Sequence, residues 1–175
     1  MTASIRPAQP SEIPAVGDLV ARSFNHLDAC AYLVPSAADR VPVMGAYFTL
    51  LSEHAAEYGR VDVIDGSADE GLAATAVWFD VTGDAPEPPD YEKRLAAFTG
   101  EYLPRFEALD QLLAKHHPED PHWHLAFLAV HPQHQHHGLG SALMDHMHGE
   151  LDARDVPSYL EATNDDNVRL YHRHG

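Results

Sequence analysis

The chain has 175 residues, enough for one domain with a sizeable core, and 27 acidic against 11 basic side chains give it a formal charge of −16. This acidity argues against a nucleic-acid partner, because such surfaces need clustered cations; it either favours attraction of a cationic small molecule or serves solubility alone. The sequence has no apolar stretch of membrane length and no leader-type apolar segment, and its single cysteine, Cys30, cannot form an internal disulfide. We therefore expect a cytoplasmic protein with no membrane partner.

The first sixty residues predict one strand and two helices. Residues 4–7 are typical of a short strand, and Ser11 is placed to cap a helix that ends near Asn25. A loop is expected over 26–36 and a second helix over 39–58. This part of the chain should therefore supply one strand and two helices.

The middle of the chain predicts a hairpin followed by a loop. Residues 60–65 and 72–81 are rich in strand-forming side chains, and the turn between them carries Asp69 and Glu70. The segment 82–89 contains three prolines and a glycine, which is typical of a loop. We expect a hairpin with an acidic tip.

Two helical segments and a buried strand come next. The helices are predicted over 90–99 and 101–116, with a further break at Pro104, and the apolar run 122–130 is typical of a buried strand. Strand alternation divides its side chains between two faces, with His122, His124 and Ala126 on one and Trp123, Leu125 and Phe127 on the other.

The last third predicts a helix, a strand and a final helix. Apolar residues at i, i+4 spacing mark one face of the first helix, namely Leu139, Leu143, Met147 and Leu151. A strand over 158–162 and a helix capped by Asn164 or Asp165 follow. The element order predicts an α+β fold, a mixed β-sheet flanked by helices on both faces, in a single domain spanning 1–175.

A glycine turn, Gln-His-His-Gly-Leu-Gly at 135–140, joins the buried strand to the helix after it. The first N–H groups of a helix have no internal partner, and glycines let an anion approach the backbone closely. The spacing gives neither the dinucleotide fingerprint nor a Walker loop. The turn predicts a phosphate site, although glycine at a tight strand–helix corner would leave the same pattern.

Two motifs together indicate a family. The turn has the pattern Gln-x-x-Gly-x-Gly, and the segment 159–175 carries Leu160-Glu161, Asn167 and Leu170-Tyr171. In both, the chain resembles the GNAT superfamily of acyl-coenzyme A N-acyltransferases. With Val77-Trp78 and the helical insert at 90–117, it is similar to the puromycin N-acetyltransferase-like branch. The resemblance covers essentially the whole chain and is strongest over 118–175.

The resemblance implies an acetyl-CoA-dependent N-acetyltransferase with acetyl-CoA as co-substrate. It would move the acetyl group to a primary amine of a small cationic molecule by direct attack in a ternary complex. Tyr171 would be the general acid for the departing thiolate, and Asn167 would bind the cofactor arm. The central strand would hold pantetheine and the turn the pyrophosphate, through Leu128, Ala129, Val130, Gln135, His136, His137, Gly138, Leu139, Gly140 and Ser141.

The family's fold usually continues beyond this point with two more strands. This chain stops at Gly175, so we expect a C-terminal truncation with those strands missing. An exposed sheet edge favours association, which makes a homodimer an expected partner arrangement.

Several assignments stay open from sequence alone. The sequence does not determine the general base, which accepts the amine proton directly or through water; His124 and Glu161 are the candidates. Asn167 could serve only as a first-turn cap residue. Tyr171 could be an ordinary amphipathic core residue. An aromatic acceptor pocket and core packing are both open for Tyr47, Trp78 and Phe79.

Histidine is unusually frequent, with 14 in the chain and ten of them between 116 and 148. The sequence has no H-E-x-x-H and no cysteine partner set, so we expect no physiological metal. Two alternatives to the enzyme remain: a non-catalytic acyl-CoA-binding or sensing module on the same fold, and a histidine-rich metal-binding protein.

Overall fold

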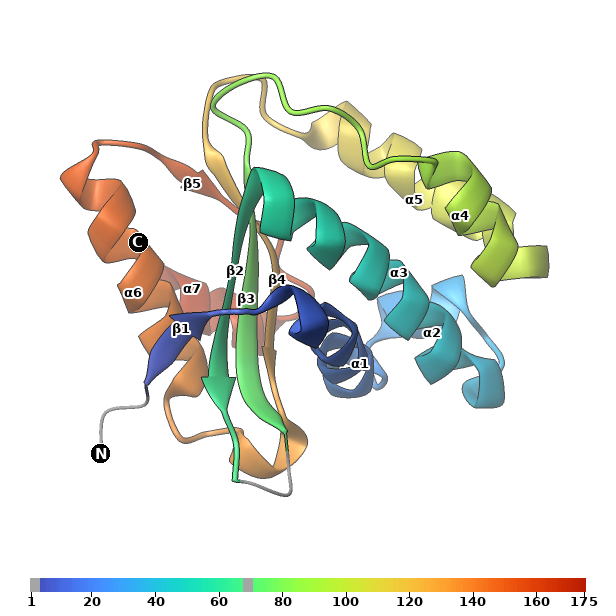
Figure 1. The fold of residues 1–175 in the computed structure, drawn as a ribbon, viewed down its shortest axis with the longest axis horizontal. Coiled ribbons are helices and arrows are strands. Elements are labelled where there is room, and N and C mark those ends of the chain that lie inside the picture. The colour runs from blue at the N-terminus through green and yellow to red at the C-terminus, as the bar shows by residue number, and fades with distance from the viewer. Residues whose placement is uncertain (1–3, 68–70) are drawn as a thin grey trace.

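The computed structural model describes residues 4–67 and 71–175, and the chain forms a five-stranded mixed sheet with helices on both faces (Figure 1). The strands lie in the order β1-β2-β3-β4-β5, with antiparallel neighbours up to β4 and a parallel β4–β5 pair. The predicted α+β class is confirmed, while the acidic hairpin tip at Asp69 and Glu70 lies outside the described residues. The strand bounds are β1 Ile5–Pro7, β2 Gly59–Asp65, β3 Leu72–Asp80, β4 Trp123–Val130 and β5 Ser158–Tyr159.

The helices form two layers and an outlying pair. In Figure 1, α1 and α3 cover one face of the sheet, α6 and α7 lie on the other, and α4 and α5 lie beyond α3. No helix in the described ranges is long and apolar enough to cross a lipid bilayer. The helix bounds are α1 Ile13–Phe24, α2 Asp28–Leu33, α3 Ala37–Tyr58, α4 Tyr91–Thr99, α5 Leu103–His116, α6 Leu139–Ala153 and α7 Asp165–His172, with short 3-10 turns η1 Pro10–Glu12, η2 Gly100–Tyr102 and η3 Pro132–His134.

Each face of the sheet has its own apolar core. Val77 packs with Phe48 and Phe106 on the α1/α3 side, and its neighbour Trp78 is fully buried on the α6 side, because successive strand residues face opposite ways. The predicted apolar face of α6 is confirmed, since the second core includes Leu143, Met147 and Leu151 with Leu139 packed against it.

Two predictions in the N-terminal part are wrong. Helix α2 forms inside the predicted loop 26–36, because it buries Cys30 and Leu33 in the core. Ser11 lies inside η1 and does not cap α1. The carboxylate of Glu12 instead accepts the backbone N–H of Gln9 at 2.7 Å.

The predicted helix break at Pro104 is also wrong. It lies in the first turn of α5, where a proline removes no intrahelical hydrogen bond. Helix α5 therefore begins at Leu103 and runs without interruption to His116.

A bulge in β4 overturns the predicted alternation. Val77 pairs with Phe127 and Trp78 pairs with Leu125, so Ala126 is an extra residue on β4. Beyond this point the faces exchange, and Phe127 joins the α1/α3 core while Leu125 belongs to the α6 core. The predicted grouping of Phe127 with Leu125 is therefore wrong.

Strand β5 is much shorter than the predicted 158–162. It pairs with β4 only at Trp123–Ser158 and His124–Tyr159. No strand in the part of the chain that the structure describes pairs with the rest of that edge of β4. The two strands separate, and the second half of β4 lines a groove.

Candidate active site

The turn before α6 is shaped by backbone conformation more than by close packing. Gly138 has φ +80°, in the left-handed region, and a Cβ there would meet nothing within 4 Å. A Cβ at Gly140 would make only ordinary contacts of 3.7–3.9 Å with Leu128, Val130 and Leu170. A tight corner therefore does not account for the two glycines.

The N-terminal amides of α6 are left for a ligand. Nothing in the described chain accepts a hydrogen bond from the backbone N–H of Leu139, Gly140 or Ser141. Such amides carry the positive end of the helix dipole and bind anions.

These amides open into a groove of about 540 Å³ between α1, β4, α6 and α7. Tyr171 and every predicted cofactor-binding residue except His137 line it. The Nδ1 atom of His137 lies 3.3 Å from the carbonyl oxygen of His134. Residues that are distant in sequence thus meet at the predicted phosphate turn.

Two of the predicted binding groups are already engaged within the protein. The side chain of Gln135 donates to the carbonyl of Val130 at 3.2 Å, and the hydroxyl of Ser23 donates to the same carbonyl at 3.1 Å. Gln135 therefore ties the turn to the end of β4.

Two arginines, Arg169 on α7 and Arg173 directly after it, line the groove and were not predicted from the sequence. Arg169 pairs with Asp166, whereas Arg173 has no carboxylate within ion-pair distance among the described residues. Their i, i+4 spacing on one helical face was the available signal. Both place positive charge near the amides of α6.

Asn164 caps α7, by accepting the backbone N–H of Asn167 at 2.9 Å. The Asn167 side chain lines the groove and donates to the Thr163 hydroxyl at 2.7 Å. Tyr171, on the same helix, is half-buried, and burial raises the pKa of its phenol. The phenol therefore stays protonated at neutral pH.

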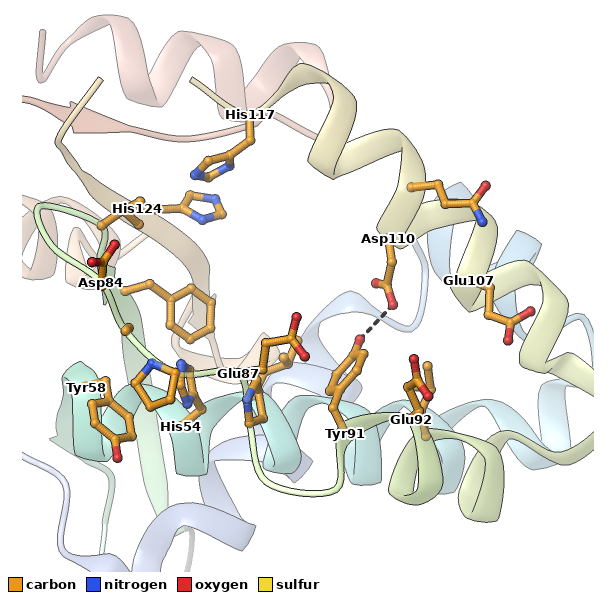
Figure 2. Close-up of a pocket in the computed structure, with 18 of the residues that line it drawn as sticks. His54, Tyr58, Asp84, Glu87, Tyr91, Glu92, Glu107, Asp110, His117 and His124 are labelled. Carbon is orange, nitrogen blue, oxygen red and sulfur yellow. Dashed lines mark hydrogen bonds between the residues drawn. The ribbon is translucent and has the colours of Figure 1, made fainter. Parts of the chain in front are cut away.

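A second, larger cavity of about 1260 Å³ lies between α3, the loop 82–89, α4 and α5, and the start of β4 reaches it through His124 (Figure 2). Six carboxylates line it against a single ammonium, that of Lys93. Such a surface attracts cations. The carboxylates are Asp80, Asp84, Glu87, Glu92, Glu107 and Asp110.

The two base candidates lie in contact. The Nε2 atom of His124 is 2.8 Å from the carboxylate of Glu161, which follows β5. Burial raises the pKa of Glu161, but hydrogen bonds from His124 and Tyr159 and nearby positive charge outweigh it and leave the pKa lowered. The Glu161 carboxylate is therefore ionised, and its contact with Nε2 fixes the orientation of the His124 ring.

A histidine cluster adjoins this pair. His117 lines the same cavity, with ring centroids 5.0 Å from His124, and its Nε2 is 3.1 Å from Nε2 of the buried His122. Burial, and then charge on its two histidine neighbours, lower the pKa of His117, so this ring is neutral at pH 7. Within 4–67 and 71–175, no three His, Cys, Asp or Glu side chains form a group that could hold a metal ion.

The structure separates the three aromatic residues for which an acceptor pocket and core packing were both open. Phe79 lines the cavity, whereas Tyr47 and Trp78 are buried in the two cores. His54 and Tyr58, one turn apart at the end of α3, line it as well.

Comparison with known proteins identifies this arrangement. A model of the acetyltransferase (GNAT) family matches residues 90–175. A structure from Corynebacterium glutamicum, described as histone acetyltransferase HPA2 and related acetyltransferase, is 28% identical with a TM-score of 0.74, over 100% of this chain and 84% of that one. Residues 90–175 of this protein match the GNAT acetyltransferase family, and its whole length shares the fold of a related acetyltransferase.

Two more distant structures share the GNAT fold. Arylalkylamine N-acetyltransferase 2 from Aedes aegypti is 13% identical with a TM-score of 0.63, and an agmatine N-acetyltransferase is 17% identical with a TM-score of 0.60. Each alignment covers 100% of this chain and 82% of the other. The predicted enzyme class, an acyltransferase of the GNAT family, is confirmed.

Proposed function

We propose that this GNAT protein transfers the acetyl group of acetyl-CoA to a primary amine of a small cationic molecule, by direct attack in a ternary complex. The observation that carries the proposal is the groove in which the unpaired amides of Leu139, Gly140 and Ser141 meet the phenol of Tyr171. A diphosphate suits the first end of this groove and a thiol leaving group suits the second.

Acetyl-CoA fits the groove by charge and by shape. The α6 amides and Arg173 offer positive partners for the pyrophosphate in a protein that is otherwise strongly acidic. The free edge of β4 offers backbone groups at Leu128 and Ala129 for the amides of the pantetheine arm. His136 and His137 of the turn are added donors, of which only His136 lines the groove.

The chemistry needs an acid for the leaving group. The amine nitrogen attacks the thioester carbonyl carbon, the carbon–sulfur bond breaks, and the thiolate takes the proton of the Tyr171 phenol. Asn167, in the same groove, binds the cofactor arm once its hydrogen bond to Thr163 is exchanged.

The chemistry also needs a base, because an ammonium ion cannot attack. We assign this role to His124, with Glu161 as the carboxylate that orients its ring and stabilises the charge it acquires. The acidic cavity that His124 lines would gather the cationic acceptor.

The acceptor class is supported by the names of related folds. The arylalkylamine and agmatine N-acetyltransferases both act on amines by their names. Membership of the puromycin N-acetyltransferase-like branch stays a prediction, because Val77 and Trp78, on which it partly rested, are buried core residues. A homodimer likewise stays a prediction.

The direct test is thiol release from acetyl-CoA across a panel of primary amines, with calorimetric titration of coenzyme A in parallel. We expect coenzyme A to bind and at least one cationic amine to be acetylated. Absence of coenzyme A binding by folded protein would contradict the proposal. Binding without turnover of any amine would favour the acyl-CoA-binding module.

A further inference from the structure

The large cavity has two chemically different ends (Figure 2). His124 and His117 lie at one end, where we place amine deprotonation, and Tyr91 and Asp110 lie at the other. Asp110 lies in the second half of α5, and His117 directly follows that helix seven residues later, which at the helical rise corresponds to roughly 10 Å. The cavity is therefore longer than one ammonium group requires.

The far end is acidic, and its carboxylates are not paired with the one ammonium of the cavity, that of Lys93. Figure 2 shows Glu107 and Asp110 on α5 opposite Glu87 and Glu92 from the loop and α4. Among the described residues, no Lys, Arg or His lies within ion-pair distance of these four carboxylates. Elsewhere in the protein, carboxylates of the same kind are paired, as Glu53 is with Arg94.

Among these four carboxylates, that of Asp110 is held in place by its neighbours in the cavity wall. It is half-buried, and the Tyr91 hydroxyl donates to it at 2.9 Å, which fixes its direction. Burial, followed by the nearby charge of Glu107, raises the pKa of Asp110 against the opposing hydrogen bond. A carboxylate desolvated without a cation is unfavourable, and a bound cation would offset that cost.

Apolar side chains contribute to the same lining, among them Leu51, Phe79 and Leu95. A methylene chain would bury its surface there without leaving a polar group unpaired.

We propose that the acceptor is a dication, an α,ω-diamine or a guanidino-amine whose two charged groups lie roughly 10 Å apart. One amine reacts at His124, and the second cation is held by Asp110 with Glu107 and is not acetylated in the same turnover. This inference rests on the proposed function, since it takes the His124 end as the place of acetyl transfer.

The test compares 1,8-diaminooctane with octylamine, which has the same chain length and one cation. We expect the diamine to have a kcat/KM at least about tenfold higher, the order of one partly buried charge pair, with an advantage that shrinks as salt is added. Asp110→Asn should remove most of that advantage and leave octylamine within about twofold. Glu101→Gln removes the same charge from an exposed site on η2 outside the cavity and should change neither substrate.

Equal kcat/KM for the two amines, or an equal loss for both in Asp110→Asn, would overturn the inference. Glu107→Gln, at a more exposed position, serves if Asp110→Asn fails to fold by its melting curve. Calorimetric binding of both amines in the presence of coenzyme A separates the two proposals. Diamine-selective binding without acetylation would support the dication site and contradict acetyl transfer, whereas no selectivity would contradict the dication site whether or not acetyl transfer occurs.

Discussion

The groove at α6 and the cavity between α4 and α5 are suited to ligands of opposite charge and are built from different groups. The groove presents backbone amides together with Arg169 and Arg173, whereas the cavity presents side-chain carboxylates. Strand β4 contributes to both sites: His124 in its first half lines the cavity, and its second half lines the groove. Backbone amides suit the phosphates of a cosubstrate. The side chains of α4, α5 and the loop 82–89 could then determine which acceptor binds without altering the cosubstrate groove.

The largest effect should come from the phenol of the groove. Tyr171→Phe should lower kcat by about 10²–10⁴-fold and leave the affinity for coenzyme A unchanged, because it removes the proton of the leaving group alone. Tyr32→Phe is the matched control, because Tyr32 is exposed and lines neither the groove nor the cavity. Unchanged turnover in Tyr171→Phe would remove the general-acid assignment.

The same residue predicts a pH dependence. Burial raises the pKa of Tyr171, and catalysis needs its protonated form, so activity is present below that pKa and lost only as pH rises through it. The alkaline limb of kcat should therefore lie above about pH 10, the ordinary phenol value. A limb near neutrality that disappears in Tyr171→Phe would contradict the burial argument.

The cavity end should respond more weakly. His124→Gln and Glu161→Gln should each lower kcat/KM by about 10²-fold, and the double variant should lose little more, because the two side chains act as one hydrogen-bonded unit. Steady-state kinetics of all three variants checks this. Multiplicative losses would mean that the two residues act independently.

A smaller effect is expected at the phosphate turn. Gly138→Ala forces a side chain into the left-handed region at a cost of about 1 kcal/mol and should weaken coenzyme A binding by roughly fivefold. Gly149→Ala, within α6 and also free of neighbours within 4 Å, should stabilise the helix slightly and leave binding unchanged. Equal coenzyme A affinity in both variants would count against the turn as the pyrophosphate site.

The smallest effect should be at the rim of the groove. Arg173→Gln should weaken coenzyme A binding by about threefold at low salt, with the difference vanishing near 1 M salt, because an exposed charge pair is screened. Titration calorimetry at two ionic strengths measures it.

The groove could be predicted from sequence because most of the residues that line it are close together in the chain. The strand, turn and helix around Gly138 follow one another directly, and among the described residues the distant contributions come from α1, α7 and the residues that flank these two helices. The mixed sheet and the core face of α6 were predicted for the same reason, since periodicity is a local property.

The cavity could not be predicted, because it is assembled from α3, the loop 82–89, α4 and α5 with β4. The contact between His124 and Glu161 depends on how β5 docks beside β4, and the bulge at Ala126 depends on the register with β3. Helix α2 forms because Cys30 and Leu33 are buried in the core, a tertiary contact that the local sequence over 26–36 does not reveal.

The most direct test is a crystal structure with acetyl-CoA bound. We expect pyrophosphate oxygens within hydrogen-bonding distance of the backbone N–H groups of Leu139, Gly140 and Ser141, and the thioester sulfur beside the phenol of Tyr171. A diphosphate bound away from the start of α6, or a sulfur far from that phenol, would contradict it.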